Sequence, residues 1–226
     1  MAATVCEFVA DFWILIKTIK KTMSRNLKHV DFVSASFSSK EEAAVWVNLK
    51  EGDKKALSFF YTKYFNNLYN YGTKITKDAG LTEDCIQDLF IELWNKREGL
   101  SDVNNVKYYL FKSLRRKIIY KLSLLSRLPV GEIDSFDIEL SHKSHYLSQQ
   151  IDSDIREKIL QLIKTLSPKQ KEAIFLIYYE ELCYEEAALI MDLKVKTVYN
   201  LIHLAISKLR ENKEKLSLPS FFSLLF

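Results

Sequence analysis

Apolar side chains recur every three to four residues along most of this chain, a spacing that predicts α-helices. The widest apolar face lies in segment 54–72, "KKALSFFYTKYFNNLYNYG", and Gly72 is expected to end that helix. A capping-box pair, Ser39 with Glu42, predicts an earlier helix, and "EGD" at 51–53 is expected to separate the two. The apolar face of segment 54–72 comprises Leu57, Phe60, Tyr61, Tyr64, Phe65, Leu68 and Tyr71.

Two further helices complete this first group. One is expected to start near Thr82, with two acids in its first turn, where the helix dipole favours negative charge, and to run to Gly99. A long helix is expected to follow, from about Asn105 to Leu125. The four helices can share one core, which predicts a helical domain over residues 39–126. The apolar face of the helix that starts near Thr82 comprises Cys85 or Ile86, Leu89, Phe90, Leu93 and Trp94.

A polar segment then separates two helical groups. Residues 127–152 contain a proline, a glycine, scattered acids and no sustained period, which predicts a linker. Helical periodicity returns over 153–216, and the chain is predicted to be all-α, with two small helical domains. Residues 1–38 form an N-terminal extension and 217–226 an apolar tail, and the pattern assigns neither a role.

The second group contains two recognisable helix starts. "SPKQ" at 167–170 has Ser167 as a cap, Pro168 at the first helical position and Gln170 three residues after the cap. The stretch "YEEAALIMDLKVKTVYNLIHLAISKLRE", which starts at Tyr184, has the pattern helix, break, helix, typical of a helix-turn-helix.

Two residues support that helix-turn-helix prediction. Ala188 is small enough for a crossing helix, and Asp192 tolerates a left-handed backbone at the turn. The second helix is expected to bury Val195, Val198, Ile202, Ala205 and Leu209. The turn and outer face then carry groups that can contact bases and phosphates: Lys194, Lys196, Thr197, Tyr199, Asn200 and His203. A helical hairpin that only packs is the alternative for this stretch alone.

Composition removes several other classes of protein. The 226 residues include only 5 Gly and 3 Pro, too few for parallel sheets or Gly-rich phosphate loops. The 3 cysteines form no C-x-x-C pair, and an odd count suits a reducing cytoplasm. His142 and His145 have no Cys nearby and no Glu on a predicted helix, so no metal or other cofactor is expected. The apolar run near the N-terminus is too short to span a bilayer, so no transmembrane segment and a cytoplasmic location are expected.

Charge is informative in its distribution. The net charge is only +4, yet residues 107–127 carry seven basic side chains and no acidic one. Such a stripe attracts phosphates, although a solvated helix face is the ordinary alternative. The seven are Lys107, Lys112, Arg115, Arg116, Lys117, Lys121 and Arg127.

Both helical groups resemble regions of one family. "LSPKQKEAIFLIYYEELCYEEAALIMDLKVKTVYNLIHLAISKLRE" (166–211) resembles region 4 of bacterial sigma factors of the sigma-70 family, in its Leu-Ser-Pro-x-Gln, Tyr-Glu-Glu-x-Ala, Thr-Val and Lys-Leu-Arg frames. "EDCIQDLFIELWNKRE" (83–98) resembles region 2.2, and "NNVKYYLFKSLRRK" (104–117) resembles the start of the promoter-melting segment. A chain with only regions 2 and 4 resembles the extracytoplasmic-function (ECF) group.

The resemblance implies a dissociable subunit that directs core RNA polymerase to promoters, helps open the DNA and catalyses no reaction. It implies partners as well: core RNA polymerase, promoter DNA and an anti-sigma factor, with no small-molecule substrate. Residues implied to bind core polymerase are Asp84, Gln87, Asp88, Ile91, Glu92 and Asn95. Residues implied to bind minus-ten DNA are Asn104, Asn105, Lys107, Tyr108, Tyr109, Lys112, Arg115 and Arg116. Residues implied to bind minus-thirty-five DNA are Lys194, Lys196, Thr197, Tyr199, Asn200, His203 and Lys208.

One departure from the family affects the last of these surfaces. Leu201 and Leu204 stand where the family often has basic residues, so fewer phosphate contacts and a shallow salt dependence of DNA binding are expected.

Three other functional interpretations compete with a sigma factor. They are a helix-turn-helix regulator that binds duplex DNA without core polymerase, a polymerase-binding decoy that has lost DNA recognition, and an enzyme. A regulator of the response-regulator kind would need an α/β receiver domain upstream, and the sequence shows no such pattern. An enzyme would need a nucleophile–base pair, a metal cluster or a phosphate loop, and the sequence shows none of these.

Overall fold

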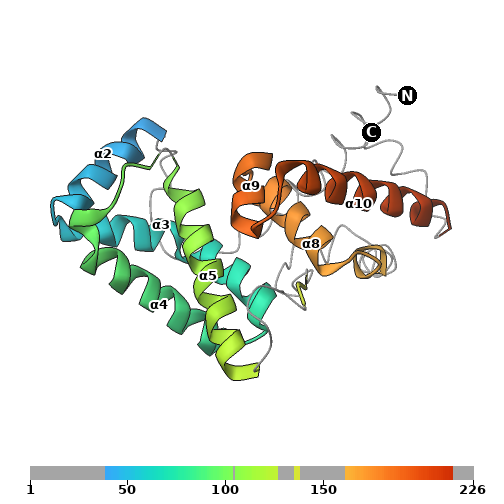
Figure 1. Cartoon of the computed structure of the whole chain (residues 1–226), viewed down its shortest axis with the longest axis horizontal. Coiled ribbons are helices and arrows are strands. Elements are labelled where there is room, and N and C mark those ends of the chain that lie inside the picture. Colours follow the sequence, from blue (N-terminus) through green and yellow to red (C-terminus); the bar gives the residue numbers. More distant parts are fainter. Residues whose placement is uncertain (1–38, 104, 127–134, 138–160, 216–226) are drawn as a thin grey trace, which may run out of the picture. The chain divides into compact units, whose positions relative to one another are not determined.

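The computed structural model describes residues 39–103, 105–126, 135–137 and 161–215 (Figure 1). All regular elements among these residues are helical, which confirms the predicted fold class. The chain divides into two compact units. We call the one with helices α2–α5 the N-terminal unit and the one with helices α8–α10 the C-terminal unit. The predicted N-terminal extension, the apolar tail and most of the predicted linker lie outside the described residues.

Four α-helices and one short 3-10 helix build the N-terminal unit. They are α2 (Ser39–Lys50), α3 (Lys54–Thr76), α4 (Ala79–Asn95), η1 (Arg97–Gly99) and α5 (Val106–Ser126). Helices α3, α4 and α5 pack against one another, and α2 packs on α3 (Figure 1). The predicted shared core is confirmed, and its largest fully buried side chains include Trp46, Leu49, Phe60, Leu68, Tyr71, Ile86, Leu110, Phe111, Leu114 and Ile118.

The start of α4 differs from the prediction. The helix begins at Ala79 rather than near Thr82, because Asp78 is its N-cap and accepts a hydrogen bond from the Leu81 backbone N–H at 3.0 Å. Thr82 is instead a buried residue of the first turn, and its hydroxyl donates to the Asp78 carbonyl oxygen at 2.8 Å.

The end of α3 also differs from the prediction. Gly72 does not terminate the helix, which continues to Thr76 and ends at Lys77, a residue with φ of 56°. A Cβ built on Gly72 would lie 2.5 Å from Thr82 Cγ2 and 3.3 Å from Ile118 Cδ1. Gly72 therefore allows α4 and α5 to approach α3 closely, which is a role in tertiary packing rather than in helix termination.

Three residues of the predicted linker pack on the N-terminal unit. Phe136 is buried, and its ring centroid lies 6.0 Å from that of Tyr71. The Asp137 backbone N–H donates to the Lys74 carbonyl oxygen at 3.1 Å, and the Asp137 carboxylate forms an ion pair with Lys77 at 2.8 Å. The chain after α5 therefore returns to α3 before it leaves this unit, so these residues do not behave as a free linker.

The C-terminal unit consists of α8 (Pro168–Ile174), a π-helical turn η2 (Phe175–Tyr179), α9 (Tyr184–Met191) and α10 (Val195–Lys215). The predicted capping box at the start of α8 is present in both directions between Ser167 and Gln170. Asp192 has φ of 56°, as predicted for the turn between α9 and α10. Buried apolar side chains of this unit include Ala173, Leu176, Ala187, Ala188, Val198, Ile202, Ala205 and Leu209.

Candidate polymerase and nucleic-acid interfaces

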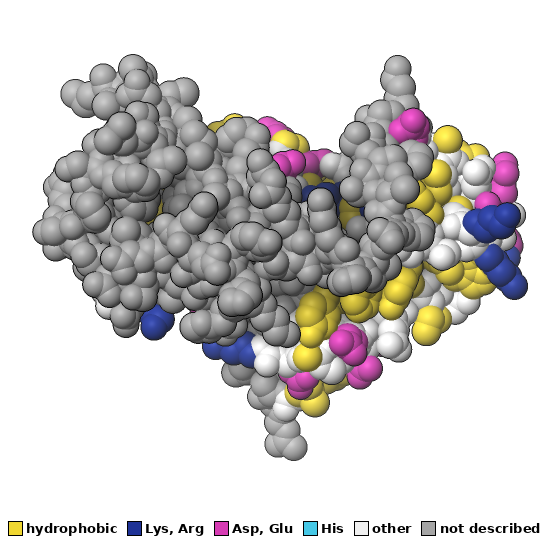
Figure 2. All heavy atoms as spheres, turned by 180° about the vertical axis from the view of Figure 1, so that it is seen from behind, with side chains coloured by type: hydrophobic (Ala, Val, Ile, Leu, Met, Phe, Trp, Pro, Cys, Tyr) yellow, Lys and Arg dark blue, Asp and Glu magenta, His cyan; other side chains and the backbone are white. Residues whose placement is uncertain are grey.

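The surface of α4 opposite its core carries a row of polar and acidic side chains around one apolar residue. Ile91, in the middle of this row, is 57% exposed. Among the other residues predicted to bind polymerase, Asp88 is half-buried, whereas the remainder are exposed: Asp84, Gln87, Glu92 and Asn95. All six thus lie on the outside of the N-terminal unit, where a partner can reach them. Exposed hydrophobic side chains among charged ones are also visible on the described surface in Figure 2.

Two ion pairs join the acids of α4 to the basic residues of α5. Asp88 Oδ2 lies 2.8 Å from Lys121 Nζ, and Glu92 Oε1 lies 2.6 Å from Lys117 Nζ. The hydrogen bond from each lysine holds the pKa of its carboxyl group below the ordinary value. The acidic row of α4 and the basic stripe of α5 therefore neutralise each other in part along the α4–α5 boundary.

These ion pairs predict a pH-dependent stability. Because both carboxyl groups have a folded-state pKa below the unfolded value, their stabilisation is present above about pH 4 and is lost as pH falls through the folded pKa. Replacing both lysines (K117M/K121M) is expected to lower the unfolding free energy at pH 7 by about 0.5 kcal/mol per pair, since the acids are about half exposed and screened by solvent.

Urea unfolding at pH 7 and pH 3 measures this effect. The difference between wild type and K117M/K121M should shrink markedly at pH 3. Lys96→Met is the matched control, because Lys96 Nζ lies 4.0 Å from Glu92 and should contribute little. A difference that stays constant between the two pH values would contradict the assignment.

The structure narrows the nucleic-acid surface predicted on α5. Arg115 is only 7% exposed, and Phe111 is fully buried against Tyr71, at a ring-centroid distance of 5.1 Å. Tyr109 is half-buried against Trp46, at 5.2 Å between centroids, and this burial raises the pKa of its hydroxyl. The reason is geometric: one face of α5 must cover the core, and these three residues lie on it or at its edge.

The remaining predicted residues of α5 stay accessible at its N-terminal half. Arg116 is exposed and Lys107 is half-buried. Lys112 Nζ donates to the Tyr108 hydroxyl at 2.8 Å and lies 5.4 Å from the centre of that ring. A flat ring with an adjacent cation is the combination that favours contact with unpaired bases and their phosphates. Asn104 lies outside the described residues.

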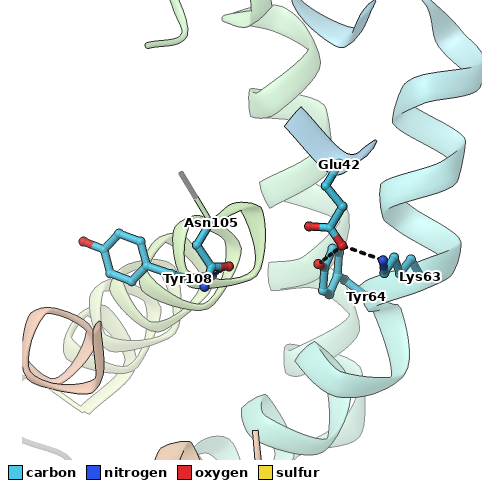
Figure 3. A network of polar contacts seen from close by, with 5 residues as sticks. All are labelled: Glu42, Lys63, Tyr64, Asn105 and Tyr108. Atoms are coloured by element: carbon cyan, nitrogen blue, oxygen red, sulfur yellow. Dashed lines mark hydrogen bonds and ion pairs between the residues drawn. The ribbon is translucent and has the colours of Figure 1, made fainter. Parts of the chain in front are cut away.

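Asn105 has a structural role at the start of α5. Its Oδ1 accepts a hydrogen bond from the Tyr108 backbone N–H at 3.2 Å, so Asn105 caps the helix (Figure 3). The Tyr108 ring projects away from this cap (Figure 3). In the same view Glu42 of α2 accepts hydrogen bonds from Lys63 at 2.5 Å and Tyr64 at 2.8 Å, which ties α2 to α3. The Asn105 cap thus fixes the end of α5 that carries Lys107 and Tyr108, and Glu42 joins α2 to α3.

One exposed aromatic residue of α5 was missed by the sequence reasoning. Tyr120 is 60% exposed and lies one helical turn beyond Arg116, on the same side of the helix. Leu124 follows after another turn and is also exposed. Positions 116, 120 and 124 are spaced by four residues, so the sequence alone could have placed Tyr120 and Leu124 on the same side of the helix as Arg116. The accessible surface of α5 is thus longer than the predicted one.

The helix-turn-helix of the C-terminal unit is built by local caps. The Cys183 backbone N–H donates to Glu186 Oε2 at 3.0 Å, and the Glu186 N–H donates to Cys183 Sγ at 3.4 Å. This reciprocal pair has the geometry of a capping box, with a thiol in place of the usual hydroxyl. It fixes the start of α9, and the left-handed Asp192 then directs the chain into α10.

The outer side of α10 carries the residues predicted to bind minus-thirty-five DNA. All seven predicted residues are exposed on the turn or the helix, and six of them are Lys194, Lys196, Thr197, Asn200, His203 and Lys208. The seventh, Tyr199, is also exposed, but one face of its ring is covered by Tyr184. Lys208 Nζ donates to the Thr165 carbonyl oxygen, which ties it to the chain before α8.

The two leucines that depart from the family differ in environment. Leu204 is 57% exposed and so lies on the outer side of α10, whereas Leu201 is half-buried. Only Leu204 therefore presents a large apolar surface to a partner.

The described residues were also compared with the requirements of a metal site and of a membrane-spanning helix. No group of three or more His, Cys, Asp or Glu side chains that could hold a metal ion occurs in the part of the chain that the structure describes. No described helix is both long and apolar enough to cross a membrane.

Comparison with known families finds a match on each unit. The family model described as "Sigma-70 region 2" matches residues 60–127, and that described as "Sigma-70, region 4" matches residues 156–209. The RNA polymerase sigma-E factor of Streptomyces avermitilis is 22% identical over 149 residues, which cover 65% of this chain and 79% of that protein. The ECF RNA polymerase sigma factor SigK of Mycolicibacterium vanbaalenii is 23% identical over 148 residues, which cover 60% and 70%.

Solved structures show the same fold. CnrH, in complex with the cytosolic domain of CnrY, aligns with a TM-score of 0.51 and 16% identity, and covers 77% of this chain and 97% of that one. The sigma factor RpoE of Bartonella quintana, in complex with the anti-sigma factor NepR, aligns with a TM-score of 0.52 and 20% identity, and covers 71% and 98%.

Matches to both helical units, in this order, define a transcription initiation factor. The chain belongs to the sigma-70 family, in the extracytoplasmic-function group of RNA polymerase sigma factors. A helix-turn-helix regulator that acts without core polymerase would share only the C-terminal unit. The match over 60–127 therefore does not support that alternative.

Proposed function

We propose that the surfaces described above divide the work of initiation among three helices. The exposed side of α4 binds core RNA polymerase, the N-terminal half of α5 binds the minus-ten DNA, and the outer side of α10 binds the minus-thirty-five DNA. The domains that carry these roles are residues 39–126 and 153–216. The observation that carries the proposal is the arrangement of α4 and α5, which share one core and present an acidic and a basic surface.

Electrostatics supports the assignment of α4 to a protein partner and α5 to DNA. An acidic surface repels phosphates, so α4 suits a basic protein surface through its acids, of which Asp88 and Glu92 are also paired with lysines of α5. The exposed Ile91 supplies an apolar anchor. The accessible part of α5 has Lys112 beside Tyr108 and also carries Lys107 and Arg116, which suits an opened DNA strand.

We also propose an anti-sigma partner and action in the cytoplasm, without catalysis by the chain itself. Two structural neighbours bear on the partner: RpoE was solved with the anti-sigma factor NepR, and CnrH with the cytosolic domain of CnrY. A protein encoded beside this chain that blocks its transcription activity with core polymerase would be the expected anti-sigma partner.

Reconstituted transcription tests the proposed function. Core RNA polymerase and the full chain are mixed with genomic DNA fragments, and the transcripts are mapped. Promoter-specific initiation that requires both components is the expected result. Binding to core without initiation would instead indicate a decoy, and tight sequence-specific binding to duplex DNA without core would indicate an ordinary regulator.

A further inference from the structure

Two tyrosine rings are stacked on the surface of the helix-turn-helix. Tyr184 is the first residue of α9 and Tyr199 lies in the second turn of α10. Their ring centroids are 4.0 Å apart and the ring planes differ by only 6°. Because the rings are nearly parallel and this close, the face of Tyr199 that meets Tyr184 is unavailable to any other partner. Tyr199 is nevertheless 50% exposed, so its opposite side and edge face outward.

A buried third tyrosine holds Tyr184. The hydroxyl of Tyr178, in the π-helical turn η2, is hydrogen-bonded to the Tyr184 hydroxyl. Burial raises the pKa of both hydroxyls above the ordinary value. Tyr178 is only 7% exposed, which makes it a rigid support. The contacts therefore run from the interior of the unit, through Tyr184, to the outer side of α10.

The neighbours of Tyr199 on this outer side are exposed polar side chains: Lys196, Asn200 and His203. An exposed polar side chain loses conformational freedom when it binds a partner. A ring already held by a stack loses little further freedom. The stack on Tyr184 therefore preorganises the Tyr199 ring on the proposed DNA surface of α10.

We propose that Tyr184 is a positioning residue for DNA selectivity, which fixes the Tyr199 ring so that its edge and hydroxyl meet a base edge in the minus-thirty-five element. This inference rests on the proposed function of α10. Because one face of Tyr199 is covered, the ring makes edge and hydroxyl contacts, such as a hydrogen bond to a base or contact with a thymine methyl group. Leu201 and Leu204 stand where the family often has basic residues, and no Lys or Arg occurs between Lys196 and Lys208, so selectivity in this part of α10 depends more strongly on such a fixed contact.

A stack that only joins α9 to α10 is the competing explanation. It predicts that removal of the stack lowers the stability of the C-terminal unit and reduces transcription from every promoter alike. Positioning predicts a loss confined to promoters with the cognate minus-thirty-five element. The ratio of transcription from an intact promoter to that from the same promoter with a permuted minus-thirty-five element separates the two, because the fraction of folded protein cancels in that ratio.

The experiment uses the full chain with core RNA polymerase and four variants: Y184L, Y199L, the double variant Y184L/Y199L, and Y184F. Y184L and Y199L are each expected to reduce the selectivity ratio by roughly threefold to tenfold, the range that an aromatic pair contributes. The double variant is expected to lose no more than Y199L alone, since Tyr184 acts through Tyr199. Y184F keeps the ring and is expected to retain most of the selectivity.

Three results would overturn the inference. The first is an unchanged ratio in Y184L when Y199L lowers it, and the second is a double variant whose loss equals the product of the two single losses. The third is a loss in Y184F as large as that in Y184L. Failure of the proposed function is distinguishable, because the wild-type chain would then give no promoter-specific transcript with core polymerase. A wild-type chain that initiates without any dependence on the minus-thirty-five element contradicts the positioning role alone.

Discussion

Replacing Gly72 by valine is expected to lower the free energy of unfolding of the N-terminal unit by about 3 kcal/mol. The first added carbon would lie 2.5 Å from Thr82 Cγ2, and the valine methyl groups would extend further toward α4 and α5. Thr82 cannot easily move away, because its Oγ1 bonds to the Asp78 carbonyl oxygen at 2.8 Å and lies 2.7 Å from Thr76 Oγ1. The helices must therefore separate, and core contacts are lost.

Urea unfolding of the full chain, followed by tryptophan fluorescence, measures this effect, because Trp46 and Trp94 both lie in the N-terminal unit. Gly80→Val in α4 is the matched control. Gly80 is exposed, and its nearest neighbour to an added Cβ is Asp78 Oδ1 at 3.5 Å, so a change within about 0.5 kcal/mol is expected.

A rescue variant tests the cause of the Gly72 effect. Thr82→Ser removes Cγ2 but keeps the hydroxyl and its hydrogen bonds. Gly72→Ala adds only the Cβ that would meet Thr82 Cγ2. Thr82→Ser should therefore restore part of the stability that Gly72→Ala loses. The explanation by close packing at Gly72 would be wrong if Gly72→Val unfolds at the same urea concentration as the wild type. It would also be wrong if Thr82→Ser restores no stability to Gly72→Ala.

Replacing Ile91 by glutamate is expected to weaken binding to core RNA polymerase by at least about tenfold. Ile91 is 57% exposed in the proposed polymerase-binding surface, with Asp88 and Glu92 on the same helix. An apolar side chain at the centre of a docking surface becomes fully buried on binding, whereas a carboxylate there must lose its hydration without a partner. The effect should appear in dissociation of the complex more than in its formation.

Competition between labelled wild-type chain and unlabelled variants for core polymerase measures this loss of affinity. Leu124→Glu is the matched control, because Leu124 is 64% exposed in the same unit but lies on α5, outside the proposed polymerase-binding surface. Its affinity for core should stay within about twofold of wild type. Equal losses in both variants would mean that added charge anywhere on the unit weakens binding, and the assignment of α4 would then be wrong.

Much of the fold followed from local patterns. The apolar spacing along segment 54–72 predicted the buried side of α3 at Phe60, Tyr64, Leu68 and Tyr71. Of the other residues assigned to that face, Leu57 and Phe65 are half-buried and Tyr61 is exposed. The capping box of Ser167 and Gln170 and the left-handed turn at Asp192 were also predicted. These features depend on residues within one or two turns of each other, so the order of side chains along the chain is sufficient to indicate them.

Errors arose where residues distant in sequence decided the local structure. Gly72 resembles a helix terminator, yet α3 continues through it to Thr76, and the glycine instead makes room for Thr82 and Ile118. The stripe of basic residues on α5 similarly suggested one continuous phosphate-binding surface. Ion pairs to α4 and burial of Arg115 remove part of it, and neither is visible in the spacing of the stripe itself.

The sequence by itself determined the all-α class, the two helical groups, the helix-turn-helix and the resemblance to both sigma regions, because helical periodicity, caps and motif frames are local properties of the chain. The tertiary structure alone decided which predicted site residues remain accessible, that Phe136 returns to α3, and that Tyr184 covers one face of Tyr199. The physical reason is that burial, ion pairing and ring stacking depend on which helices lie side by side, and a periodic pattern specifies the face of each helix without specifying the neighbour that meets it.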